Sequence, residues 1–227
     1  MSPPVYNNRS MLIVHGEHAF ELDDAINALA SIHRVLRKTL GRTCKVHALF
    51  NKDDLPHLCT LEEMDEDFIR SLFEDHPARG NQPMLSAIFT YQTRTRVAQG
   101  MFNFDHTIDS LHLSIDMPNR GIPRKHIIAL AESIIEHLDP QWMVYHNRAL
   151  IDAFYRVYPR FFRTAWLTYH TGMASDLPRW RTLEILETTR GVMCVAKPDW
   201  FGRTGEDLIE ELVELDEMIE DVSPYGW

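Results

Sequence analysis

A long amphipathic stretch near the C-terminus constrains the fold of this chain more than any other part of its sequence. Between residues 205 and 222, large aliphatic side chains recur every three or four positions, which is the period of a helix with one buried stripe. These residues are Leu208, Leu212, Leu215, Ile219 and Val222. A helix of this kind has to cover another layer, and we expect it to pack on a β-sheet.

Carboxylates cover the rest of this predicted helix, which carries no Lys or Arg. They are Glu206, Asp207, Glu210, Glu211, Glu214, Asp216, Glu217, Glu220 and Asp221. Helix energetics do not favour them, because carboxylates in the last turn oppose the helix dipole and like charges four residues apart repel by about 0.2–0.5 kcal/mol. Two interpretations stay open: a solvated outer face, and an acidic platform for a basic protein partner.

Hydrophobic periodicity predicts the other elements. Strands are expected at 11–14, 44–50, 84–90, 95–104, 109–117, 141–146 and 164–170, with a hairpin of 182–188 and 192–197. Helices are expected at 21–40, which Gly41 ends, from Thr60 to before Pro77, at 123–137 and at 148–158. Thr60 and Glu63 match a capping box, and Pro123 suits the first position of a helix.

Helices alternate with clustered strands, a pattern typical of an α+β fold rather than a regular βαβ array. We therefore expect a mixed or antiparallel sheet, or two such sheets, with helices packed on one face. Residues 1–227 are predicted to form a single domain of two coupled sub-layers, 11–105 and 106–227.

The charge and the cysteines limit the partners and the compartment. The 227 residues carry a net charge of -10, which disfavours nucleic acid as a partner and suits a basic protein. Cys44, Cys59 and Cys194 form no CxxC pair, as expected in a reducing compartment. We expect no signal peptide and no membrane span, and hence a cytoplasmic protein without a membrane partner.

No common catalytic motif is present, so we predict a protein that is not an enzyme and has no catalytic residue, metal or cofactor. Candidate metal-ligating side chains are His15 with His18, and a group made of Asp105, His106, Asp109, His112 and Asp116. Neither spacing matches a known metal site, although a metal-dependent hydrolase stays open as an alternative. Cys194 lies in an apolar strand, where packing is a better explanation than nucleophilic chemistry.

Two tryptophans are placed in predicted loops, where Trp is often the anchor of a protein interface. We therefore name as candidate partner-binding residues Glu210, Glu211, Glu214 and Glu217 of the acidic helix, together with Trp180 and Trp200.

The C-terminal third resembles a known family in three segments. They are Ala165 to Tyr169, Leu183 to Thr188, and Gly191 to Val195, followed by the amphipathic helix. This order resembles the immunity protein 52 family, antitoxins of bacterial polymorphic toxin and type VI secretion system (T6SS) loci. The resemblance implies a small α+β protein without catalysis and a cognate toxin, in several loci a nuclease. It assigns no binding residues.

The sequence and the resemblance together predict an immunity protein that binds and neutralises a secreted toxin, a nuclease effector of a T6SS. An effector adaptor or chaperone is a further alternative. The identity of the toxin, its mode of inhibition and the oligomeric state stay open.

Overall fold

The computed structural model describes residues 9–16, 22–49, 57–74, 84–93, 97–105, 110–118, 123–159, 163–173 and 177–222. The chain divides into two compact units. The N-terminal unit consists of residues 14–140, and the C-terminal unit consists of residues 1–13 and 141–227. Strand β1 (Arg9–Gly16) contains the division between them. The α+β class predicted from the sequence is confirmed.

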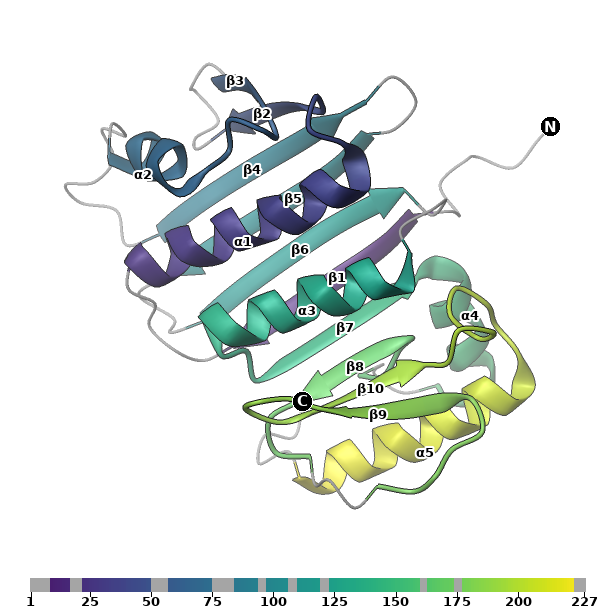
Figure 1. Cartoon of the computed structure of the whole chain (residues 1–227). Helices are drawn as coiled ribbons and strands as arrows, with labels where there is room; N and C mark the ends of the chain where they lie inside the picture. The colour runs from purple at the N-terminus through teal and green to yellow at the C-terminus, as the bar shows by residue number, and fades with distance from the viewer. Residues whose placement is uncertain are drawn as a thin grey trace. The chain divides into compact units, whose positions relative to one another are not determined.

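An antiparallel sheet forms one layer of the N-terminal unit. Its strands are β2 (Lys45–Leu49), β3 (His57–Thr60), β4 (Met84–Gln92), β5 (Val97–Asp105) and β6 (Ser110–Pro118). They pair in the order β3-β2-β4-β5-β6, so the predicted strands 84–90 and 95–104 pair as β4 and β5. The helices are α1 (Leu22–Leu40), α2 (Glu66–Glu74) and α3 (Arg124–Leu138). Figure 1 shows α1 and α3 side by side on one face of these strands.

Helices α1 and α3 run antiparallel and are joined by polar contacts. The Thr39 hydroxyl lies 2.9 Å from Nδ1 of His126, which joins the end of α1 to the start of α3. Halfway along, the Ser133 hydroxyl donates to the hydroxyl of Ser31. At the end of α1, Gly41 has a φ of 90°, which favours glycine, so the predicted helix stop is confirmed.

A neutral histidine lies in the core of the N-terminal unit. His33 is fully buried on α1, its Nε2 is 2.8 Å from the Tyr91 hydroxyl, and its ring meets the Phe89 ring edge-on at 5.0 Å. Burial lowers the pKa of His33 from 6.5 to about 3; the backbone of Leu29 opposes this and the charge of Arg37 adds to it. Since the imidazolium is disfavoured, a neutral ring shares this hydrogen bond with the Tyr91 hydroxyl.

The stability of the N-terminal unit is expected to fall as the solution is acidified. The pKa of His33 is lower in the folded chain than in the unfolded chain, so its contribution is complete above about pH 6.5 and is lost toward pH 3. By about pH 5 the loss is about 2 kcal/mol relative to neutral pH. Urea unfolding of the wild type and His33→Gln, followed by far-UV circular dichroism, measures this difference. Equal pH dependence in the two proteins would contradict it.

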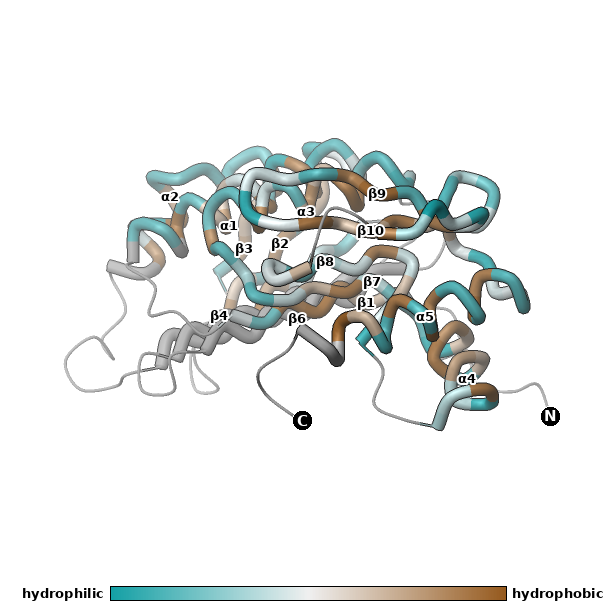
Figure 2. Tube along the Cα trace, turned by 90° about the horizontal axis from the view of Figure 1, so that it is seen from below, coloured by the Kyte–Doolittle hydropathy of each residue, from teal (hydrophilic) through white to brown (hydrophobic). Residues whose placement is uncertain are grey.

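The C-terminal unit has a second antiparallel arrangement of strands. Its elements are β7 (Trp142–Asn147), α4 (Arg148–Val157), β8 (Leu167–His170), β9 (Leu183–Glu187), β10 (Val192–Ala196) and α5 (Glu206–Val222). The strands pair in the order β7-β8-β10-β9. Figure 2 shows α4 and α5 on one side of these strands, and α5 has both hydrophobic and hydrophilic residues along its length. The predicted hairpin and acidic helix are thus confirmed.

A glycine permits the close approach of β10 to β8. A Cβ atom on Gly191 would lie only 2.8 Å from the backbone oxygen of His170 and 3.1 Å from the ring of Tyr169. Because no real side chain tolerates the backbone contact, this position requires glycine. The glycine that opens the strand in the resemblance above therefore has a packing role.

Two details differ from the expectations. Thr60 donates to Glu63 through both its amide, at 2.7 Å, and its hydroxyl, at 2.8 Å, so residues 61–63 form a turn. Helix α2 begins later and is capped by Asp65, whose Oδ1 accepts from the amide of Phe68 at 2.9 Å. Pro123 is the N-cap of α3 and not its first residue. The single domain of residues 1–227 and its sub-layers 11–105 and 106–227 stay predictions.

Candidate partner-binding surface

Helix α5 is fixed to the C-terminal unit by its aliphatic stripe. Leu208, Leu212 and Leu215 are fully buried, and Ile219 is 1% exposed. The Thr164 hydroxyl donates to the backbone oxygen of Leu212 at 2.9 Å, which ties the middle of α5 to the segment before β8. The hydrophobic stripe predicted from the sequence is therefore the packing face of this helix.

One flank of α5 holds a loop of the same unit. The carboxylate of Glu211 accepts from the amides of Arg181, at 2.8 Å, and Thr182, at 2.9 Å, and from the Thr182 hydroxyl. Glu214 accepts from the indole of Trp180 at 2.8 Å, and Asp207 pairs with the Arg181 guanidinium at 2.8 Å. These three carboxylates thus have partners within the unit.

Lys197, which directly follows β10, holds the same loop in place. Its ammonium donates to the backbone oxygens of Trp180, at 2.7 Å, and Arg181, at 2.9 Å. Trp180 is only 7% exposed, so in this arrangement its ring offers little surface to another protein. Trp180 lies in a loop, as predicted, but it packs against α5. Its role as an interface anchor stays a prediction that this burial does not support.

The side of α5 that faces away from its aliphatic stripe presents an outer row of carboxylates, which we define as Glu206, Glu210 and Glu217. All three are exposed, and their spacing of four and seven residues places them on one side of the helix. None forms a hydrogen bond or ion pair with the described part of the chain. The outer row therefore adds negative charge to the surface that no cation of the described residues pairs with.

Asp216 differs from the other carboxylates of α5, because it is completely buried. Its Oδ1 accepts from the amide of Arg163 at 3.1 Å and lies 3.7 Å from Nε of the same residue. The backbone oxygen of Arg163 in turn accepts from the indole of Trp142 at 3.0 Å. The expectation that Asp216 belongs to the acidic surface is wrong, since this residue anchors α5.

Trp200 lies in the turn that precedes α5. A Cβ atom on Gly205 would lie 2.8 Å from the Trp200 ring, so the glycine allows the indole to pack against the backbone there. The side chain is half-buried. Of the six candidate residues, the structure thus joins Glu211, Glu214 and Trp180 in one contact network, and it leaves Glu210 and Glu217 exposed.

The other ionisable candidates show no assembled site. His18, His106 and Asp109 lie outside the described residues. Within the described ranges, no group of three or more His, Cys, Asp or Glu side chains is arranged to hold a metal ion. Burial raises the pKa of Cys194 to about 12, which disfavours the nucleophilic thiolate. Among the same residues, no helix is long and apolar enough to cross a membrane.

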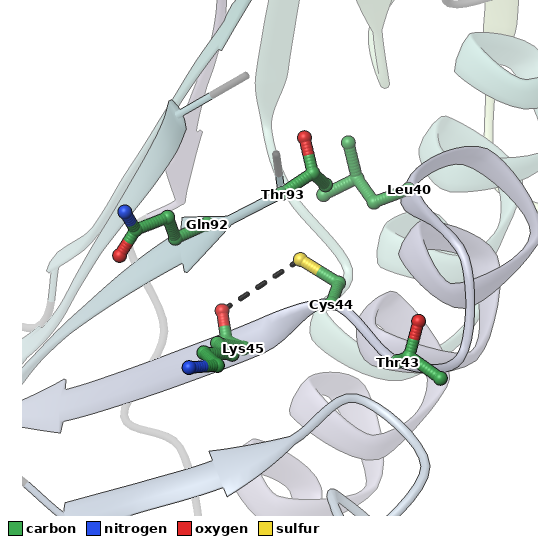
Figure 3. Close-up of a pocket in the computed structure, with 6 residues that line it drawn as sticks. All are labelled: Leu40, Thr43, Cys44, Lys45, Gln92 and Thr93. Atoms are coloured by element: carbon green, nitrogen blue, oxygen red, sulfur yellow. Dashed lines mark hydrogen bonds between the residues drawn. The ribbon is translucent and has the colours of Figure 1, made fainter. Parts of the chain in front are cut away.

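A hollow of about 570 Å³ opens in the N-terminal unit at the end of α1. It is lined by Leu40, Thr43, Cys44, Lys45, Gln92 and Thr93, which Figure 3 shows as sticks. The Cys44 thiol points to the backbone oxygen of Lys45, at 3.6 Å. Burial raises the pKa of this thiol, although the backbone of Gln92 opposes the shift, so Cys44 is no activated nucleophile.

No protein-family model and no curated protein matches this chain. Among solved structures, the chain is similar to the Pseudomonas aeruginosa T6SS protein PA0821, with a TM-score of 0.61, 9% identity, and coverage of 95% of this chain and 77% of that chain. At this identity the likeness shows the fold alone. The resemblance to the immunity protein 52 family stays a prediction, and the chain shares its fold with a T6SS protein.

Proposed function

We propose that this protein is an immunity protein, which binds a cognate secreted toxin and neutralises it without any reaction of its own. The observation that carries the proposal is the outer row of α5, in which Glu206, Glu210 and Glu217 are exposed and have no partner in the described part of the chain. The net charge of -10 and a fold shared with a T6SS protein support it.

The toxin in this proposal is a nuclease, because a nuclease presents basic side chains to the phosphates of its substrate. A row of carboxylates fits such a surface and competes with the nucleic acid for it. Opposite charges also accelerate association, so that the toxin is captured soon after it enters the cell.

The anchoring of α5 makes the outer row effective. Asp216, Glu211 and Glu214 hold the helix and its neighbouring loop in place through contacts within the unit. The outer carboxylates are therefore displayed on a rigid backbone, which limits the conformational entropy lost on binding. The two acidic parts of α5 thus have different roles: the anchored flank maintains the structure, and the outer row contacts the toxin.

Expression of the chain in cells tests the proposal. Cells that produce the product of the adjacent toxin gene are expected to survive when this chain is produced as well, and to die without it. Toxin lacking its N-terminal region should be neutralised equally well, since we place the contact on the toxic domain. Protection that requires the N-terminal region would favour an adaptor, and loss of viability despite full expression would contradict the proposal.

A further inference from the structure

The outward surface of α1 and α3 separates positive from negative charge. Its basic pole consists of Arg34 and Lys38 on α1 and Lys125 on α3, and its acidic pole consists of Asp24 on α1 and Glu132 and Glu136 on α3. All six side chains are exposed; the neighbouring Asp23 pairs with Arg70 at 2.6 Å and is not counted. Since the helices are antiparallel, the end of α1 lies beside the start of α3, where the basic pole lies. The acidic pole extends from the other end of the helix pair to its middle, where Ser133, next to Glu132, meets Ser31.

The energetics of an isolated chain do not account for these poles. In α1 the order of charges agrees with the helix dipole, but in α3 it is opposed: the first turn has no acidic residue and contains Lys125. Like charges also meet between the helices. Burial lowers the pKa of His126, and the charges of Lys125 and Lys38 lower it further, so both ammonium groups lie near this ring. Both arrangements are electrostatically unfavourable within a single chain.

Small or apolar half-buried side chains lie among these charges. Ala30 and Ser31 lie near the middle of α1, and Ile128 and Ala129 lie beside the basic pole. No other helix or strand of the described N-terminal unit covers this side of α1 and α3 in Figure 1. Small side chains allow another backbone to approach closely, and the charges of both poles would then surround the contact.

We propose that a second copy of this chain docks on the α1/α3 face through a two-fold axis. A two-fold rotation places the basic pole of each copy on the acidic pole of the other, so the same ion pairs form twice. The face is thus complementary to itself in charge, which is the argument for this occupant. The proposal concerns a different surface from α5 and does not depend on the proposed function.

The size of the face sets the strength expected of the dimer. A helix of 19 residues is about 28 Å long, and two packed helices are about 20 Å wide, so each copy would bury about 500 Å². The total of about 1,000 Å² is at the lower limit for a specific interface. We therefore expect a weak dimer that depends on ionic strength.

Sedimentation velocity of the full chain tests the proposal. At low salt (about 50 mM) the wild type is expected to dimerise, and at about 500 mM the dissociation constant should rise at least tenfold, because the charges are exposed and screened. The variant Lys38→Glu with Lys125→Glu should weaken the dimer at low salt by at least tenfold as well. Adding Glu132→Lys and Glu136→Lys to this variant gives the two poles opposite charges again, although Arg34 and Asp24 stay unchanged, and should restore part of the dimerisation.

The controls separate this interface from the rest of the molecule. Glu210→Lys with Glu217→Lys makes a change of charge on α5 that is equal in size and opposite in sign, and it should leave the dimer within about twofold of the wild type. The four substituted pole residues, Lys38, Lys125, Glu132 and Glu136, form no ion pair with the described part of the chain. Circular dichroism should therefore show folded variants with thermal midpoints near that of the wild type.

Three results would overturn the proposal. The first is a monomeric wild type at low salt and at every concentration. The second is a dimer that withstands the reversal of the basic pole. The third is a folded basic-pole variant that still dimerises as the wild type does but binds the toxin more weakly, which would assign this face to the toxin.

Discussion

Reversal of the charges of Glu210 and Glu217 to lysine is expected to weaken toxin binding by about 100-fold or more. Both carboxylates are exposed and have no partner in the described part of the chain, so no contact within the protein is lost. Each substitution replaces an attraction to a basic surface by a repulsion, and about 1.4 kcal/mol for each gives this factor. Surface plasmon resonance with immobilised toxin measures the affinity and both rate constants.

A matched variant keeps this prediction specific. Glu132→Lys with Glu136→Lys makes the same change of net charge on α3 and should leave toxin affinity within a few-fold of the wild type. Higher salt should slow the association of the wild type more than that of Glu210→Lys with Glu217→Lys, because steering by the outer row is then screened. If the α3 and α5 variants lose affinity equally, net charge and not α5 determines binding.

Replacement of Asp216 by alanine is expected to destabilise the C-terminal unit by about 3–5 kcal/mol. This carboxylate is completely buried and pairs with Arg163, whose side chain is 14% exposed. Removal of one member of a buried pair leaves the other charge without compensation, which is the costly case. All five tryptophans lie in this unit, so their fluorescence during urea unfolding reports on it.

The adjacent carboxylate provides the control. Glu217→Ala removes an exposed side chain with no described partner and should change the free energy of unfolding by less than about 0.5 kcal/mol. Asp216→Asn keeps an acceptor for the Arg163 amide and should lie between the two. Equal stability of Asp216→Ala and Glu217→Ala would show that Asp216 does not anchor the helix.

Local patterns in the sequence predicted most of the secondary structure. The aliphatic stripe of α5 and the alternation in β2 follow from side-chain periodicity, which depends on neighbours a few residues away. The start of α2 was misplaced because Thr60 and Glu63 match a capping pattern, although Thr60 donates both bonds and Asp65 caps the helix. The residue types at these positions do not show which partner donates the hydrogen bond.

The candidate surface was only partly predictable. The carboxylates of α5 are evident in the sequence, but the residues that engage them are about 30 positions away or more, as with Glu211 and Thr182 or Asp216 and Arg163. No local period encodes such contacts. The division of α5 into an anchored flank and an outer row therefore needed the tertiary structure, and so did the placement of Lys38 and Lys125 near His126.

The most direct test of the account is a titration of the purified toxin with this protein, with the toxin's cleavage of DNA as the readout. Neutralisation by binding predicts a linear loss of activity that is complete at one equivalent, with recovery of active toxin when the complex is dissociated. Inhibition by a small fraction of an equivalent, or toxin that stays inactive after the protein is removed, would show turnover and contradict the central claim.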